Sequence, residues 1–168
     1  MHRRRFLGWL GVAGILGAVP GFVLARPKLS LERGADVEVL TLDDAEWRER
    51  LSKERYRILR EADTEPAGSS PLDKETRAGE YRCAGCDLPL FSSRTKYDSG
   101  TGWPSFFDHI EGHLLTELDF VLLIPRTEYH CARCGGHQGH VFEDGPEPTG
   151  LRWCNSGLAL RFVPDETG

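Results

Sequence analysis

Two cysteine pairs of the form C-x-x-C constrain this chain more than any other feature of its sequence. The first pair is Cys83 and Cys86, the second is Cys131 and Cys134, and 44 residues separate them. Two intervening residues let a tight turn direct both thiolates at one tetrahedral Zn²⁺ ion, and two such turns complete a closed site of four sulfurs. The metal would therefore tie distant segments of a small domain together.

Disulfide bonds are the alternative for these four cysteines, because a protein that is exported meets an oxidising compartment, and the first residues of this chain suggest export, as described below. A bond within a C-x-x-C pair closes a very small loop, which constrains the unfolded chain little. Bonds between the two pairs are the other form of this alternative. The spacing favours a single structural Zn²⁺ ion, which leaves no coordination position for a substrate.

The first 25 residues have the layout of an export signal. Arginines at positions 3–5 precede an apolar stretch that ends near Ala25, where small residues suit a signal peptidase. The order of two arginines, a spacer, Phe6 and Leu7 resembles the twin-arginine signature. An uncleaved membrane anchor is the alternative, since about 20 apolar residues can span a bilayer. We expect an exported, periplasmic or otherwise extracytoplasmic protein that touches a membrane only if this leader is retained.

The net charge argues against a nucleic-acid partner. The formal net charge is −5, and loss of the three leader arginines takes it from −5 to −8. Non-specific affinity for nucleic acids depends on clustered Lys and Arg, which an acidic chain does not supply. We therefore expect the partners to be other molecules.

The remaining chain predicts a linker over 26–40, one domain over 41–164 and a short tail over 165–168. Gly and Pro are plentiful, and β-branched and aromatic residues occur in short runs. This pattern is typical of strands and turns rather than of long helices. We therefore expect a compact, mainly β domain with a small helical segment at its front.

Two short helices are expected before the strands begin. Thr41 is the predicted cap of the first, with Asp44 three residues later, and Ser52 is the predicted cap of the second. Residues 63–79, rich in Pro, Gly, Ser and charge, predict a surface loop. The expected strands cover 80–82, 88–92, 114–118, 120–124, 128–131, 151–154 and 158–163.

The fifth cysteine stands outside both pairs. Cys154 lies two residues after Arg152. A nucleophilic cysteine reacts as its thiolate, and a nearby cation lowers the pKa of the thiol. An isolated cysteine is more often a small buried hydrophobic residue. The segments around it decide between these interpretations.

Two other segments hold side chains suited to catalysis. His137 and His140 lie three residues apart and Asp144 follows them; His and Asp are common suppliers of a proton to a reacting oxygen. Trp103 lies on a turn bounded by glycine and proline. Taken singly, the histidines suit a metal and the indole suits a core. Four thiolates already satisfy one zinc, however, and the coincidence of these residues with Cys154 favours an active site.

The run from about Leu42 to Val163 resembles the B-type methionine sulfoxide reductases, which are methionine-R-sulfoxide reductases. The matching blocks are the two C-x-x-C pairs, SGTGWPSF, GHQGHVFEDGP and RWC followed by LALRF. Each block is specific, and their order and spacing leave little room for chance agreement. The resemblance implies two antiparallel sheets tied by a structural zinc, a fold of the β-tent (Mss4-like) type, with short N-terminal helices.

The resemblance also implies roles for the residues of these blocks. Cys154 is the implied nucleophile toward the sulfoxide sulfur, and His140, with His137 nearby, is the implied acid that protonates the oxygen. Methionine leaves, and a cysteine sulfenic acid remains on the enzyme. Asp144 and Arg152 are the implied residues that shape the pocket and tune the thiol.

The implied substrate pocket includes Trp103 and Phe142. The family often has Asn two residues after the nucleophile, where this chain has Ser156, with Asn155 one residue earlier. Either side chain is a candidate for orienting the sulfoxide. Many members carry a recycling cysteine where this chain has Thr101. With four cysteines bound to zinc, an external thiol, such as a thioredoxin-like protein, must reduce the sulfenic acid.

These inferences predict a thiol-dependent reductase that returns methionine-R-sulfoxide in proteins to methionine and so repairs oxidised exported proteins. It would need one structural zinc and no organic cofactor. A zinc-stabilised binding module without catalysis is the alternative, although it leaves Cys154 and the two histidines without a role. A structural protein held by disulfides would contain no zinc.

Overall fold

The computed structural model describes residues 29–120 and 125–166. The expected leader over 1–25 lies outside these residues, as does the expected strand over 120–124 apart from its first residue, which is not in a strand. Among the helices in the described part of the chain, none combines the length and the apolar character needed to cross a membrane.

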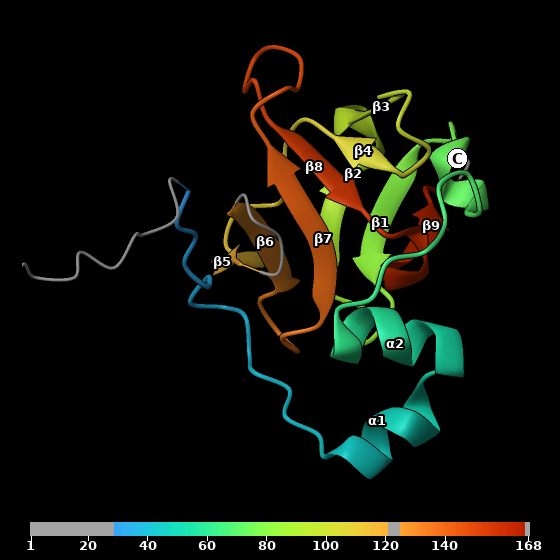
Figure 1. The fold of residues 1–168 in the computed structure, drawn as a ribbon, viewed down its shortest axis with the longest axis vertical. Helices are drawn as coiled ribbons and strands as arrows, with labels where there is room; N and C mark the ends of the chain where they lie inside the picture. Colours follow the sequence, from blue (N-terminus) through green and yellow to red (C-terminus); the bar gives the residue numbers. More distant parts are fainter. Residues whose placement is uncertain (1–28, 121–124, 167–168) are drawn as a thin grey trace, which may run out of the picture.

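Two antiparallel sheets form the domain, which confirms the predicted fold class (Figure 1). The described residues build a three-stranded sheet with the order β2-β1-β9 and a six-stranded sheet with the order β3-β4-β8-β7-β6-β5. The strands are β1 (Gly79–Cys83), β2 (Pro89–Ser92), β3 (Lys96–Tyr97), β4 (Ser105–Phe106), β5 (Leu114–Asp119), β6 (Arg126–Cys131), β7 (His137–Phe142), β8 (Arg152–Asn155) and β9 (Leu160–Pro164).

Two short helices, α1 (Asp44–Arg50) and α2 (Lys53–Glu61), precede the sheets. The predicted cap of the first helix was wrong. Asp43 begins it, because its carboxylate accepts a hydrogen bond from the Glu46 amide at 2.9 Å while the Glu46 side chain accepts one from the Asp43 amide at 2.7 Å. This reciprocal pair satisfies two helix-end donors at once. Ser52 caps α2 as predicted and accepts from the Arg55 amide.

The strand β7 was missed, because His137–Phe142 carries the histidine motif rather than an alternating apolar pattern. It lies between β6 and β8 in the six-stranded sheet. The predicted strand over 158–163 starts too early, since a 3₁₀ turn covers Gly157–Ala159 and β9 begins at Leu160. Other 3₁₀ turns cover Pro71–Asp73 and Ser93–Thr95.

Aromatic rings fill the space between the two sheets. Phe91 and Phe106 stack with ring centroids 4.2 Å apart, and Tyr129 meets Trp153 edge to face at 5.0 Å. All four rings have no exposed surface. Trp153 therefore fixes one face of β8 against the core, and the alternation of side chains along a strand turns its neighbour Cys154 to the opposite face.

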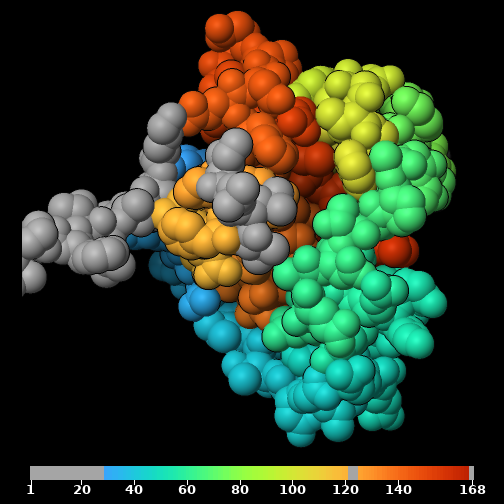
Figure 2. Space-filling view, in the orientation of Figure 1, coloured from blue at the N-terminus to red at the C-terminus, as the bar shows by residue number. Residues whose placement is uncertain are grey.

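The segment before α1 lies along the outer strand β5 (Figure 2). The Leu31 amide donates to the Thr116 hydroxyl at 3.1 Å, and that hydroxyl donates to the Leu29 carbonyl at 2.8 Å. The Arg33 side chain donates to the Ala132 carbonyl at 2.7 Å. These contacts cover a sheet edge that would otherwise expose unpaired backbone groups.

Candidate active site and metal centre

The four paired cysteines converge where the two sheets meet. Cys83 and Cys134 have their Sγ atoms 3.7 Å apart, and Cys86 and Cys131 have theirs 3.4 Å apart. Tetrahedral Zn–S bonds of about 2.3 Å place sulfurs about 3.8 Å apart, whereas a disulfide joins them at about 2.05 Å. All four cysteines are buried and free of disulfides. The donor set fits a closed structural zinc site rather than the disulfide alternative.

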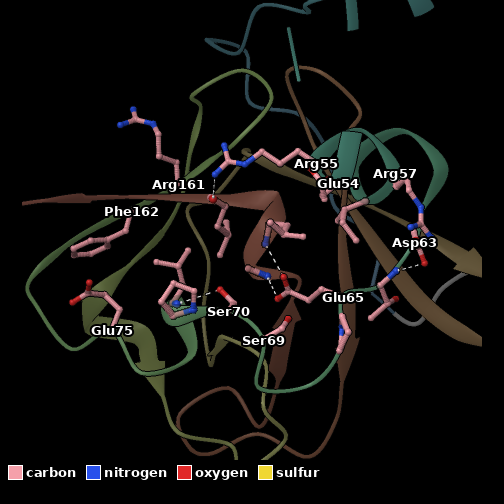
Figure 3. Close-up of a pocket in the computed structure, with 18 of the residues that line it drawn as sticks. Glu54, Arg55, Arg57, Asp63, Glu65, Ser69, Ser70, Glu75, Arg161 and Phe162 are labelled. Atoms are coloured by element: carbon pink, nitrogen blue, oxygen red, sulfur yellow. Dashed lines mark hydrogen bonds and ion pairs between the residues drawn. The ribbon is translucent and has the colours of Figure 1, made fainter. Parts of the chain in front are cut away.

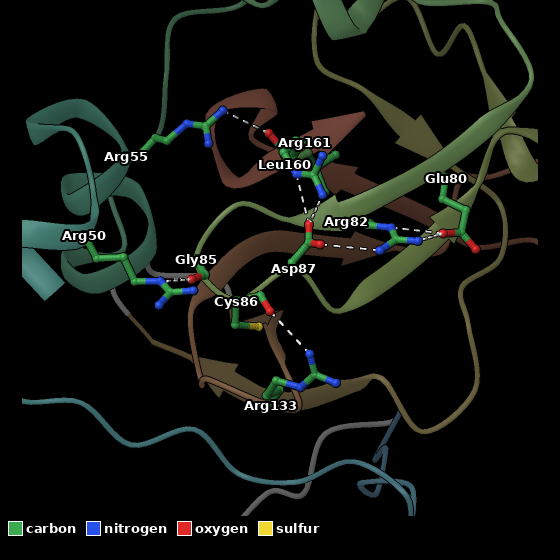
Figure 4. A network of polar contacts seen from close by, with 10 residues as sticks. All are labelled: Arg50, Arg55, Glu80, Arg82, Gly85, Cys86, Asp87, Arg133, Leu160 and Arg161. Carbon is green, nitrogen blue, oxygen red and sulfur yellow. Dashed lines mark hydrogen bonds and ion pairs between the residues drawn. The ribbon is translucent and has the colours of Figure 1, made fainter. Parts of the chain in front are cut away.

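Arginine side chains hold the backbone of the first cysteine turn (Figure 4). Arg50 of α1 donates to the Gly85 carbonyl at 2.7 Å, and Arg133 donates to the Cys86 carbonyl at 3.3 Å. From β7, the buried Gln138 amide donates to the Cys83 sulfur at 3.4 Å. Contacts of this kind orient metal ligands. Gln138 also joins the metal centre to the strand that carries the two histidines.

Cys154 lies in the middle of the six-stranded sheet, on β8. Its cross-strand partners are His140 on β7 and Ser105 on β4. Residues directly opposite each other in an antiparallel pair have Cβ atoms about 4.5–5.5 Å apart and share a face of the sheet. The sheet therefore brings the predicted nucleophile and the predicted acid side by side.

A cavity of about 140 Å³ opens beside Cys154. Every predicted catalytic and substrate-binding residue except Asp144 and Arg152 lines this cavity. The lining residues are Thr64, Trp103, Arg126, His137, Gly139, His140, Phe142, Cys154, Asn155 and Ser156.

A bulge in β7 places both histidines at this cavity. In a regular strand, residues three apart point to opposite faces of the sheet. Here the pairing with β6 shifts between Tyr129 and His130, so that Tyr129 faces Gly139 while His130 faces His137. The extra residue, Gln138, turns to the interior. His137 and His140 consequently share one face, with ring centroids 5.6 Å apart.

His140 is held by an acid that no sequence motif predicted. Its Nε2 donates to the Asp119 carboxylate at 2.9 Å, and that carboxylate also accepts from Arg126 at 2.5 Å. Burial lowers the pKa of His140, and the hydrogen bond with Asp119, which favours the charged ring, offsets this only in part. The resting ring is therefore neutral near pH 7. His137 has its own acid, since its Nδ1 donates to Glu128.

Arg152 lies outside the cavity wall but supports it. Its guanidinium donates to the Asp144 carboxylate at 2.8 and 2.9 Å and covers the Phe142 ring with a centroid distance of 4.3 Å. The bidentate pair fixes the arginine, and the cation–π contact fixes the ring that lines the cavity. Asp144 and Arg152 thus act on the site through Phe142 and through charge.

The Cys154 thiol is less acidic than the sequence suggests. Burial raises the pKa of Cys154, and the opposing effects of the Arg152 guanidinium and the Thr101 hydroxyl are smaller. The charge of Arg152 is shared with Asp144, which weakens its effect on the sulfur. Before substrate binds, the residue is therefore a thiol rather than the thiolate that a neighbouring cation would favour.

Trp103 is fixed by the loop that follows α2. Its indole nitrogen donates to the Glu65 carbonyl at 3.0 Å. The Glu65 carboxylate accepts from the amides of Gly157 at 2.5 Å and Leu158 at 3.1 Å, just after the nucleophile segment (Figure 3). Glu65 is buried although most of its loop is exposed, as predicted for residues 63–79.

Glu65 also lines a groove of about 970 Å³ between α2, this loop and β9 (Figure 3). None of the predicted site residues lines that groove within the described chain. The smaller cavity is therefore the candidate active site, because it holds the predicted nucleophile Cys154. No pattern in the sequence singled out Glu65, since an acid in a polar loop is usually solvated.

The SelR domain family matches residues 51–164 of the chain. The chain belongs to the SelR family. It is 52% identical over 122 residues to "Peptide methionine sulfoxide reductase MsrB" of Agrobacterium fabrum, covering 72% of this chain and 90% of that protein. It is 51% identical over 124 residues to the MsrB of Thiobacillus denitrificans, covering 73% and 94%. The chloroplastic "Peptide methionine sulfoxide reductase B1" of Arabidopsis thaliana is 46% identical over 126 residues, covering 74% and 62%.

Within this SelR domain, the side chains of Asn155 and Ser156 differ in their surroundings. The Asn155 oxygen accepts from the Tyr129 hydroxyl at 3.0 Å, and the whole residue is buried. The Asn155 amide thus ties β8 to β6 on the core side of the sheet. Ser156 follows the strand and lines the cavity, with its backbone amide donating to the Gln138 carbonyl at 3.0 Å.

Thr101 is the residue at which the resemblance implies a recycling cysteine in many family members. Its hydroxyl shares a hydrogen bond with the Ser99 hydroxyl at 2.8 Å and also interacts with the Cys154 thiol. The other four cysteines of the chain are gathered at the metal centre. Cys154 therefore has no thiol neighbour with which to form a disulfide.

Proposed function

We propose that this SelR-family chain reduces methionine-R-sulfoxide in peptides or proteins to methionine, with Cys154 as the nucleophile. The observation that carries the proposal is the cross-strand pairing of Cys154 with His140 at a cavity that Trp103 and Phe142 also line. The relatives support the same activity, because they are named peptide methionine sulfoxide reductases.

The proposed reaction needs one proton, and the resting pair of Cys154 and His140 holds one. Because Nε2 of His140 donates to Asp119, Nδ1 is the basic nitrogen that takes the thiol proton. The thiolate attacks the sulfoxide sulfur, and the imidazolium returns the proton to the sulfoxide oxygen. The S–O bond of the substrate breaks as an S–OH bond forms on Cys154. Substrate sulfur gains two electrons and the cysteine sulfur loses two, which yields methionine and a sulfenic acid.

The surrounding residues serve this step by holding charge and shape. The Asp119 carboxylate stabilises the imidazolium, and Arg126 holds the carboxylate in place. The rings of Trp103 and Phe142 offer apolar surface to the methyl and methylene groups beside the reacting sulfur. We assign the contact with the sulfoxide oxygen to the Ser156 hydroxyl rather than to Asn155, because the Asn155 amide nitrogen already donates to the Ser156 carbonyl at 3.4 Å and the residue is fully buried.

Two external thiols complete the cycle in this proposal. The first attacks the sulfenic acid and releases water, and the second reduces the mixed disulfide to regenerate the Cys154 thiol. Thr101 offers no sulfur for an internal route. A thioredoxin-like dithiol protein of the same compartment is the proposed donor.

An epimer-resolved assay tests the enzymatic proposal. With dithiothreitol as the reductant, the wild type should consume the R epimer of a methionine-sulfoxide peptide and leave the S epimer untouched. Cys154→Ser should abolish the reaction but keep the zinc content and the unfolding midpoint of the wild type, because Cys154 is separate from the metal ligands. Activity that survives in Cys154→Ser would overturn the mechanism.

We further propose that the protein is exported by its twin-arginine-like leader and repairs oxidised proteins outside the cytoplasm. Replacing Arg3 and Arg4 by lysine keeps the charge but removes the paired arginines of the signature. The double variant should stay in the cytoplasm when cells are fractionated, whereas the wild type should not. Equal export of both chains would contradict this route.

A further inference from the structure

A second cluster of metal-ligating side chains lies on the same face of the six-stranded sheet as the active site. It consists of Glu128 and His130 on β6 and His137 on β7, whose ligand atoms all lie within 4.8 Å of one another. The pairing of the strands explains the cluster. The bulge opposes His130 to His137, and Glu128 is the cross-strand partner of His140.

His130 is the member whose surroundings point most directly to a ligand. Its Nε2 is buried and, within the described chain, makes no hydrogen bond. The same atom lies 2.9 Å from a carboxylate oxygen of Glu117 and 3.3 Å from one of Glu128, outside hydrogen-bond geometry with both. An imidazole nitrogen this close to two carboxylates, without a hydrogen bond to either, is placed as a metal ligand would be.

Glu117, on the neighbouring strand, brings a further carboxylate to the cluster, with one oxygen 2.9 Å from Nε2 of His130. It pairs with Glu128 across β5 and β6, so that both carboxylates share the face that carries His130. Its side chain is 64% exposed. The cluster is consequently open to solvent on the β5 side, in contrast to the buried four-cysteine site.

The spacing of these donors suits a transition-metal ion. Bonds of about 2.0–2.2 Å from zinc to imidazole nitrogen and carboxylate oxygen place tetrahedral ligand atoms about 3.3–3.6 Å apart. The His130 nitrogen already lies at 2.9 and 3.3 Å from its two carboxylates. Two imidazoles with carboxylates select zinc, copper, nickel or cobalt over magnesium and calcium, which prefer oxygen ligands alone.

We propose a second site for a divalent transition-metal ion, formed by Glu128, His130 and His137 and completed by Glu117. Zn²⁺ is the ion used to test it. Binding of the ion at this site inhibits the reductase. His137 and Glu128 link the two functions. His137 lines the catalytic cavity and is hydrogen-bonded to Glu128 in the free protein. A bound ion breaks that hydrogen bond, fixes the ring on the metal and adds positive charge to the cavity wall.

Metal stoichiometry tests the site without reference to activity. The full chain carrying its structural zinc is dialysed against buffers that hold free Zn²⁺ at micromolar levels. The wild type should take up a second equivalent, and His130→Gln should not. Glu117→Gln should weaken the binding of the second equivalent at least about tenfold. Because Glu117 is exposed, this variant tests the site even if His130→Gln fails to fold.

Two controls separate this site from other zinc-binding groups. Glu111→Gln removes an exposed carboxylate away from the cluster and should bind both equivalents like the wild type. Cys154→Ser should also bind both, because the proposed ligands do not include the thiol. A wild type that holds one equivalent only, or a His130→Gln chain that holds two, would overturn the site.

Inhibition is tested in a single turnover, and this part rests on the proposed reductase activity. Pre-reduced enzyme forms one methionine per Cys154 without any added thiol, so no reductant removes the zinc. Micromolar Zn²⁺ should suppress this turnover in the wild type, with recovery after addition of a chelator, and should spare His130→Gln. Equal suppression of both chains would refute the inhibitory role. Absence of turnover in metal-free wild type would instead refute the reductase, leaving the dialysis result to decide the site.

Discussion

Burial moves the pKa values of the two central residues in opposite directions. It raises the pKa of the Cys154 thiol and lowers the pKa of the His140 ring, so both groups are uncharged near neutral pH. A thiol beside a neutral imidazole holds one proton. The sulfenic acid product also holds one proton, because a thiol and a sulfoxide become a sulfenic acid and a thioether without net proton uptake.

The rate of methionine formation should therefore have a broad plateau in pH. Below the lowered pKa of His140, itself below the usual 6.5, the pair gains a second proton and the rate falls. Above the raised pKa of Cys154, itself above the usual 9.0, the pair loses its proton and the rate falls again. Single-turnover rates across pH measure both limbs. A rate that climbs steadily through pH 9 would show that thiolate supply alone limits the reaction.

Asp119→Asn should slow the reaction and shift its acid limb. The Asp119 carboxylate favours the charged ring, so its removal lowers the pKa of His140 further and moves the acid limb to lower pH. The rate on the plateau should fall about 10–100-fold, less than the 10²–10⁴ that a general acid as a whole contributes. His140→Gln is the matched comparison and should lose the acid limb altogether. An unshifted acid limb in Asp119→Asn would argue against this pairing.

At the scale of secondary-structure elements, an irregular loop and a bulged strand decide the shape of the site. The bulge in β7 brings His137 and His140 to one face, and Gly139 allows β7 and β8 to approach. A Cβ at Gly139 would lie 2.0 Å from the Cys154 carbonyl oxygen, so only glycine fits there. The loop after α2 adds Glu65, which joins Trp103 to the turn that follows the proposed nucleophile Cys154.

Glu65→Ala should destabilise the protein and loosen the substrate pocket together. The change leaves the amides of the buried Gly157 and the partly buried Leu158 without their acceptor, at a cost of about 1–3 kcal/mol of unfolding free energy. The KM for a sulfoxide peptide should rise more than kcat falls, because the loop positions Trp103 rather than the reacting atoms. Denaturant unfolding and steady-state kinetics measure the two effects. Glu61→Ala, an exposed position on α2, is the control and should change neither.

At the scale of the whole molecule, the metal centre joins the two sheets. Cys83 and Cys86 belong to the three-stranded sheet and its turn, and Cys131 and Cys134 follow β6 of the six-stranded sheet. Both helices are tied to the same region, since Arg50 of α1 and Arg60 of α2 donate to the carbonyls of Gly85 and Cys134. A zinc ion held by these four cysteines would therefore fix the relative placement of the two sheets.

Loss of zinc should therefore unfold the domain rather than selectively abolish the reactivity of Cys154. Cys86→Ser should lower the zinc content, lower the thermal midpoint by at least about 10 °C and abolish reductase activity, because a structural zinc contributes folding free energy directly. Metal analysis and calorimetry measure these effects. Cys154→Ser should keep both zinc and midpoint. A Cys86→Ser chain that remained fully stable without zinc would contradict the structural role.

Local patterns in the sequence predicted the parts of this protein that depend on near neighbours along the chain. The C-x-x-C turns, the Ser52 cap and most of the short β runs each rest on contacts within a few residues, and the structure confirms them, although β9 begins two residues later than expected. The cap at Asp43 and the strand β7 were missed for a local reason. Thr41 also suited a cap, and the residues of β7 carry a motif in place of an alternating pattern.

The sequence by itself determined the four metal donors, the isolated Cys154 and its two histidines, because those residue types and spacings restrict the chemistry wherever the chain folds. Only the tertiary structure decided which acids serve the histidines. Asp119 reaches His140 across 21 positions and Glu128 reaches His137 across 9, while the buried Glu65 reaches the Gly157 amide across 92. Such pairs depend on strand register and on a one-residue bulge, and register follows from burying one whole face of a sheet rather than from any local signal.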